Sequence, residues 1–148
     1  MPEPDAEELI EELVEVRLAE ASGAGGQQPG RYGMHSLLRL FARERCRAEE
    51  PAPERTRAAR RMVGGWLHLA EQAQTRLPGG RPRIGVRGGL RWSVPTDVTA
   101  AAVADPEAWF ETERLALAGA VRTACSFGLD ELAWDLAVCL GRFLEVRG

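Results

Sequence analysis

A histidine and a serine stand side by side at a predicted structural joint, and both could do chemistry there. His35 and Ser36 lie in RYGMHSLLRLFARER, between a short strand-like segment and a strongly amphipathic helix. An imidazole can donate a hydrogen bond to a phosphate, and it adds positive charge when protonated. A serine at a helix start can accept a hydrogen bond from a free backbone N–H. Read structurally, the pair predicts His35 as the end of the strand and Ser36 as the helix cap.

A row of arginines continues along the helix predicted at residues 36–50. Arg39, Arg43 and Arg47 recur at every fourth position, so they share one helix face that could contact phosphates. Acidic residues are interspersed with them: Glu44, Glu49 and Glu50. A solvent-exposed face with internal ion pairs is therefore the competing interpretation of this row.

Signatures of an autonomous enzyme are missing from the sequence. The chain contains no lysine, so the phosphate-binding pattern GxxxxGK[ST] is excluded, and GxSxG is absent as well. The other histidine, His68, has no ligand-type residue four positions away. The spacing of Cys46, Cys125 and Cys139 does not suit zinc, and we expect three thiols buried in helices. We predict no catalytic residue and no metal site.

Composition indicates a globular protein rather than a disordered chain or a generic nucleic-acid binder. Hydrophobic residues make up 45% of the chain and charged residues 28%, with a net charge of −3. A strongly basic domain would be expected for non-specific nucleic-acid binding. We see no signal peptide and no apolar run near the roughly 18 residues that a membrane span requires. A cytoplasmic protein is the expectation.

The first third of the chain predicts a helix followed by a β-hairpin. Residues 5–16 carry one apolar stripe and one acidic face, with Asp5 as a candidate cap and Glu8 three positions later. The segments RLAEA and RYGM could pair as two short strands across the glycine-rich GAGGQQPG. Residues 36–50 then form the arginine-bearing helix, and Pro51 and Pro53 break it.

The remainder predicts one connector helix, a long loop and a pair of helices. Apolar residues recur at helical spacing over residues 54–77, whereas residues 78–104 show no periodicity. Asp105 and Pro106 predict the start of another helix, and Gly128 predicts its end. The next helix follows almost at once, so the two must be antiparallel. Both are apolar over wide arcs, which implies that further helices or a partner cover them.

These segments resemble a known family. The run LIEELVEVRLAE followed by PGRYGMHSLLRLFARERCRAEE is similar to the end of the winged-helix part of NB-ARC (STAND-class) ATPases, in particular regulators of the Streptomyces antibiotic regulatory protein type. That family typically reads RYRMHDLLRLFARE here. The segment WFETERLALAGAVRTACSFGLDELAWDLAVCLGRFLEVRG is similar to the start of the family's tetratricopeptide-like helical array. The two matches cover about two thirds of the chain.

The resemblance implies a nucleotide-proximal role for His35. In the family, the motif histidine lies near the nucleotide diphosphate and helps to hold the closed, ADP-bound state. Ser36 stands where the family has Asp, so a carboxylate is lost. The phosphate loop that this site needs lies elsewhere in such proteins. We therefore expect no cofactor in this chain, and ADP or ATP in a longer protein of which the chain is a piece.

Together these observations predict a mainly α fold. We expect a winged-helix remnant with a hairpin wing (1–50), a connector helix and Pro/Gly/Arg-rich loop (51–104), and the start of a helical-repeat region (105–148). The expected function is regulatory: coupling a preceding nucleotide-binding core to the helical repeats that follow, with DNA bound through a separate domain and self-association possible. The alternatives are a free-standing helical interaction scaffold and a DNA-binding winged helix.

Overall fold

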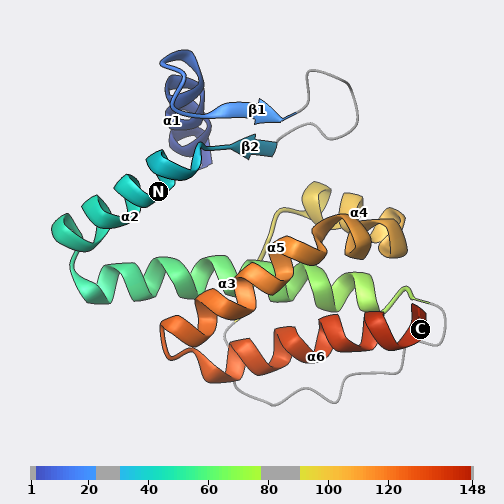
Figure 1. The fold of residues 1–148 in the computed structure, drawn as a ribbon. Helices are drawn as coiled ribbons and strands as arrows, with labels where there is room; N and C mark the ends of the chain where they lie inside the picture. Colours follow the sequence, from blue (N-terminus) through green and yellow to red (C-terminus); the bar gives the residue numbers. More distant parts are fainter. Residues whose placement is uncertain (1–2, 23–30, 78–90, 148) are drawn as a thin grey trace. The chain divides into compact units, whose positions relative to one another are not determined.

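The computed structural model of the chain describes residues 3–22, 31–77 and 91–147. These residues form six helices and one two-stranded antiparallel sheet, which confirms the expected fold class of a mainly α protein with a small hairpin. The chain divides into two compact units, residues 1–52 and 53–148 (Figure 1). Each unit is considered separately below.

The first unit consists of two helices around a short hairpin. Helix α1 (Glu3–Glu15) leads into strand β1 (Glu20–Ser22), which pairs with strand β2 (Arg31–Gly33), and helix α2 (Ser36–Glu49) follows. The strands are antiparallel, with Ala21 opposite Tyr32. The predicted hairpin is thus present, and its glycine-rich connection lies outside the described residues.

Helix α1 begins earlier than its sequence pattern predicts. Its first residue is Glu3, so Asp5, the predicted cap, stands inside the first turn. Pro4 is compatible with this start, because its fixed φ and missing N–H are tolerated in a first turn, where the backbone donors have no intrahelical partner.

The end of α1 is fixed by a left-handed residue that is not glycine. Arg17 has a φ of 58°. Its N–H donates to the carbonyl of Val14 at 3.0 Å, and the N–H of Leu18 donates to the carbonyl of Leu13 at 2.9 Å. This is the Schellman pattern, in which two free carbonyls of the last turn gain donors. A side chain at such a φ costs free energy that a glycine avoids.

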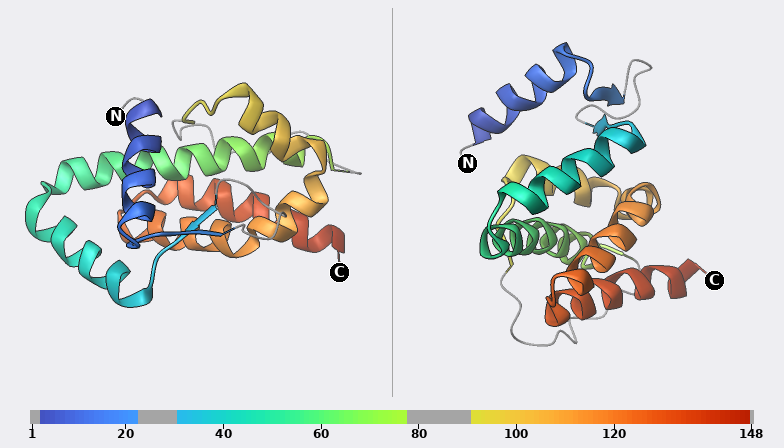
Figure 2. Two further views of the ribbon diagram at one scale, coloured as in Figure 1. Left: turned by 90° about the horizontal axis from the view of Figure 1, so that it is seen from above. Right: turned by 60° about the vertical axis from the view of Figure 1, so that its left-hand side comes forward.

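The second unit is built on a core shared by three helices. They are α3 (Ala52–Gln74), α5 (Pro106–Ser126) and α6 (Asp130–Arg147), while α4 (Thr96–Ala104) contacts α5. The most deeply buried side chains come from all three: Val63, Leu67, Phe110, Leu117 and Leu136. Figures 1 and 2 show α5 and α6 as an antiparallel pair with α3 beside them.

This core includes the helix that was predicted as part of a connector. That helix packs with the predicted helical pair, and all three helices contribute to one hydrophobic cluster. Pro53, expected to break a helix, is instead the second residue of α3. A proline is tolerated in the first turn of a helix, which explains the position of Pro53. Pro51 lies between α2 and α3 as predicted.

Aromatic rings join the three helices at one end of this core. Phe110 of α5 stacks on Phe143 of α6, with ring centroids 4.9 Å apart and planes 13° apart. Trp109 of α5 contacts Phe110 edge-on and lies 6.3 Å from Trp66 of α3. Ring contacts of this kind add about 0.5–1.5 kcal/mol each to the burial of apolar area. They help to explain why α3 packs with the predicted pair.

Caps fix both ends of α5 as the sequence predicts. The Asp105 side chain accepts a hydrogen bond from the N–H of Ala108 at 3.0 Å, and Pro106 occupies the first turn. At the other end Gly128 has a φ of 65°, and the N–H of Leu129 donates to the carbonyl of Ala124 at 2.9 Å. The chain therefore reverses within three residues, 127–129, before α6 begins.

Other expectations about this unit require correction. Residues 96–104, expected to be loop, form helix α4. The buried residues of α5 are Phe110, Leu117, Ala120 and Ala124, and Val121 is partly buried against the same core. All three thiols were expected to be buried, but only Cys139 is, whereas Cys46 and Cys125 are exposed.

The two helix ends predict substitutions of opposite sign. Arg17→Gly removes a side chain from a left-handed residue and is expected to stabilise α1 by about 1 kcal/mol, whereas Gly128→Ala introduces one and is expected to destabilise the second unit by about 1 kcal/mol. Thermal unfolding followed by circular dichroism measures both changes. Equal signs for the two substitutions would contradict the assigned backbone conformations.

Candidate functional site at the start of α2

His35 is the residue that caps α2. It has a φ of −55° and a ψ of 144°, outside the helical region, and its Nδ1 accepts a hydrogen bond from the N–H of Leu37 at 3.4 Å. Ser36, predicted as the cap, is the first residue of the helix itself. The predicted cap was one residue too late, since serine is the commoner residue at helix starts. Here the imidazole of His35 accepts a hydrogen bond from the N–H of Leu37, which has no partner within the helix.

This contact defines which nitrogen of His35 carries a proton. An acceptor at Nδ1 requires a lone pair there, so the neutral ring in this arrangement bears its proton on Nε2. The residue is exposed. His35 can therefore cap α2 through one nitrogen while its other nitrogen remains a hydrogen-bond donor for a group outside the helix.

The three predicted arginines lie along the same helix and are all exposed. Arg39, Arg43 and Arg47 occupy successive turns of α2, and the backbone N–H of Arg39 donates to the carbonyl of His35 at 3.0 Å. Within α2, Arg45 forms an ion pair with Glu49. Arg45 is not one of the three arginines of the predicted row, so this ion pair does not show that the row itself is neutralised by neighbouring acidic residues.

An exposed apolar face begins at Leu37, in the first turn of α2. Leu37, Leu40 and Phe41 are 69%, 60% and 60% exposed, and none of the residues of α2 is buried. Only Leu38, among the leucines of this helix, is half-buried. We call Leu37, Leu40 and Phe41 the α2 face. Exposed apolar side chains gathered in this way are typical of surfaces that bind another protein segment.

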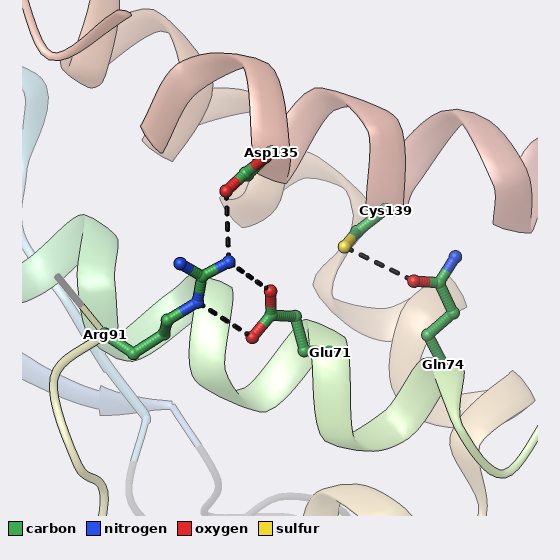
Figure 3. A network of polar contacts seen from close by, with 5 residues as sticks. All are labelled: Glu71, Gln74, Arg91, Asp135 and Cys139. Atoms are coloured by element: carbon green, nitrogen blue, oxygen red, sulfur yellow. Dashed lines mark hydrogen bonds and ion pairs between the residues drawn. The ribbon is translucent and has the colours of Figure 1, made fainter. Parts of the chain in front are cut away.

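A polar cluster that the sequence did not reveal lies in the second unit. Figure 3 shows Arg91 between Glu71 of α3 and Asp135 of α6. Its Nε and Nη2 donate to the two carboxylate oxygens of Glu71 at 3.2 and 2.8 Å, and Nη2 also donates to Asp135 at 3.1 Å. The pKa of Arg91 is raised above its usual value, mainly by the hydrogen bonds to Glu71. Burial acts in the opposite direction, and the charges of Glu71 and Asp135 add to the rise.

The role of this cluster is to hold the chain. The Asp135 side chain is 4% exposed and that of Glu71 11%, so both carboxylates depend on a positive partner. Arg91 supplies it, and thereby ties the segment before α4 to α3 and α6. Nearby, the Cys139 thiol donates to Gln74 at 3.5 Å (Figure 3). No single stretch of sequence signals this cluster, because Arg91 is 20 and 44 residues from its partners.

Two further features of the described residues concern metal ions and membranes. No group of three or more His, Cys, Asp or Glu side chains in the described segments is placed to hold a metal ion. Among the helices that the structure describes, none combines the length and the apolar character needed to cross a bilayer. The start of α2 is the candidate site because it brings together an exposed imidazole, exposed arginines and an exposed apolar face.

The cap at His35 predicts a difference between two substitutions. His35→Asn keeps a side-chain acceptor at a position where Asn is among the preferred residues, so α2 is expected to persist. His35→Ala removes the acceptor and is expected to destabilise the first turn by about 0.5–1 kcal/mol. Hydrogen exchange at the Leu37 amide reports the change. Equal exchange in both variants would show that the imidazole does not cap the helix.

The polar cluster predicts a strong effect of one substitution. Arg91→Ala leaves the buried Asp135 carboxylate without this partner and is expected to destabilise the second unit by about 2–4 kcal/mol, somewhat below a fully buried pair because Arg91 is partly exposed. Adding Asp135→Asn should recover part of the loss, which chemical denaturation would measure. Strictly additive effects would contradict a direct ion pair.

The chain is similar in sequence to two regulatory proteins. No protein-family model and no solved structure matches the chain. It is 31% identical over 140 residues to the regulatory protein AfsR of Streptomyces griseus, which covers 91% of the chain and 13% of that protein. It is 39% identical over 74 residues to AfsR of Streptomyces coelicolor, covering 47% of the chain and 7% of that protein. The chain thus spans a small part of the length of these relatives, and the similarity supports an AfsR-like family of regulatory proteins.

Proposed function

We propose that the chain acts within a nucleotide-switched transcriptional regulator, where it couples an NB-ARC core to a helical-repeat sensor. The similarity to two regulatory proteins supports the regulatory part of this proposal. The resemblance of the HS motif to the histidine motif of NB-ARC proteins supports the nucleotide part. In this proposal the core that precedes the chain supplies the phosphate loop, and a separate domain binds DNA.

One observation carries the proposal: His35 begins an exposed helix while keeping a donor for an outside group. Its Nδ1 caps α2, so its Nε2–H is available to a diphosphate oxygen. A phosphate that engages His35 therefore acts on the residue that starts the helix. Ser36, in place of the family's Asp, contributes no carboxylate, so the contact depends on the imidazole.

The continuity of the chain gives this contact a route to the repeats. Helix α2 ends at Glu49, and α3 begins at Ala52 after only Glu50 and Pro51. Helix α3 shares its core with α5 and α6. A displacement at the start of α2 is thus transmitted through a two-residue connection to a helix embedded in the second unit. The switch is mechanical and requires no catalytic residue in this chain.

The role of the core in nucleotide binding can be tested on the chain alone. Because the phosphate loop is supplied by the core, the 148-residue chain is expected to bind ADP more weakly than about 10 µM in isothermal titration. Tighter binding would contradict the proposed dependence on the core.

The role of His35 can be tested in the longer protein with a matched pair of variants. His35→Ala and His35→Asn should both weaken ADP retention by about tenfold, as expected for the loss of a hydrogen bond to a charged group, although only His35→Ala disturbs the cap. ADP release from the purified protein measures this. If His35→Asn retained ADP as the unaltered protein does, the imidazole would have only its capping role.

A further inference from the structure

The solvent side of α6 carries an apolar face of its own. Trp134, Ala137, Val138 and Gly141 follow one another at helical spacing, so they lie on one side of the helix. Trp134 is 61% exposed, Ala137 is exposed, and Val138 and Gly141 are half-buried. The α6 residues that enter the core, such as Leu136, lie on the opposite side, where α3 and α5 pack (Figure 1). We call Trp134, Ala137, Val138 and Gly141 the α6 face.

Gly141 gives the α6 face a place for a large side chain. A Cβ atom at Gly141 would meet no atom within 4 Å, so the backbone is open at this point. A glycine inside a helix is destabilising relative to alanine, and no described neighbour requires the missing side chain here. Trp134, two turns earlier, projects a largely exposed indole. A protruding ring and a bare stretch of backbone therefore share one face.

We infer that the α6 face binds the α6 face of a second copy of this chain, with the two helices antiparallel. A two-fold axis between Ala137 and Val138 sets each Trp134 over Gly141 of the partner subunit, because both residues lie 3.5 positions, or roughly 5 Å, from that axis. The same axis brings the two Val138 side chains together. This contact involves the second unit alone and requires no nucleotide, so it goes beyond the proposed function and does not depend on it.

Two charged residues beside the α6 face match this arrangement. Glu131 is exposed and Arg142 is half-buried, and neither has an ion-pair partner within the described segments. In one chain they are 11 positions apart, roughly 16 Å along the helix, which is too far for an ion pair. Across the two-fold axis, Arg142 lies only roughly 3 Å along the helix direction from Glu131 of the partner subunit. Two equivalent ion pairs then form in each dimer, which favours a second copy over an unrelated partner.

The length of the contact limits its strength. The α6 face and its two flanking charges span residues 131–142, roughly 17 Å of helix. A contact confined to this stretch buries less than the roughly 1,200 Å² at which standard interfaces begin. The dimer is therefore expected to be weak, with a Kd on the order of tens of micromolar. Trp134, at the centre of the contact, should contribute most of the affinity.

Sedimentation equilibrium of the 148-residue chain, over concentrations that bracket this Kd, tests the contact. Trp134→Glu is expected to weaken association by about tenfold or more. Gly141→Leu should weaken association similarly, because its side chain takes the place of the partner's indole, yet raise the thermal stability of the chain because leucine is a better helix former. The matched control is Leu115→Glu on α5, a leucine that is 78% exposed, and it should leave association unchanged.

Charge reversal tests the antiparallel register. Glu131→Arg and Arg142→Glu are each expected to weaken association by roughly three- to tenfold at low salt, since each replaces two attractive contacts by two repulsive ones. An equimolar mixture of the two variants should form heterodimers about as tightly as the unaltered chain forms its dimer. Each variant then supplies the charge that the other lacks.

Several outcomes would overturn the inference. They are a chain that stays monomeric over the whole series, association that Leu115→Glu weakens as much as Trp134→Glu, and a mixture of charge variants that associates no better than either variant alone. In the longer protein, a monomer that loses stability on Trp134→Glu would assign the α6 face to other helices of the same polypeptide, and would also contradict a second copy.

Discussion

The second unit depends on the reversal of the chain between α5 and α6. Gly128 adopts a left-handed conformation that a side chain would strain, and the turn closes within three residues. So short a connection holds the two helices antiparallel and aligns their apolar stripes. The surface that they form together is wider than either helix can cover, and α3 packs on it. Phe110, at the meeting of α3, α5 and α6, is then fully buried.

The first unit lacks an equivalent constraint. Its hairpin is three residues long on each side, and its helices contribute half-buried rather than buried leucines. What defines this unit is local: the cap at His35, the left-handed Arg17 and the strand pairing. The two units therefore differ in what stabilises them: local backbone contacts in the first, and a core shared by three helices in the second.

Local signals in the sequence were sufficient to predict most elements. Apolar periodicity located α3, α5 and α6, and the Asp105-Pro106 pair and Gly128 marked helix ends correctly, since these signals act within a few residues. Helix α4 was missed because TDVTAAAVA has no contrast between its faces. The Arg91 cluster and the packing of α3 in the core were not predicted. Both depend on contacts between residues far apart in the chain, and a single sequence does not indicate which distant residues meet. At the candidate site, a solvent-exposed arginine face was one of the two interpretations of the sequence. The exposure of Leu37, Leu40 and Phe41 was not predictable, because an amphipathic pattern normally indicates that the apolar face is buried.

The lack of buried side chains in α2 has a thermodynamic consequence. At 14 residues, α2 is close to the length of roughly 12–15 residues below which isolated helices are marginal in water. Most helices gain their persistence from the burial of one face, whereas α2 has no fully buried residue and only a half-buried Leu38 among its leucines. Covering this helix and completing its backbone hydrogen bonds would then be one cooperative transition. Any group that covers the α2 face would therefore also increase the helical population of α2.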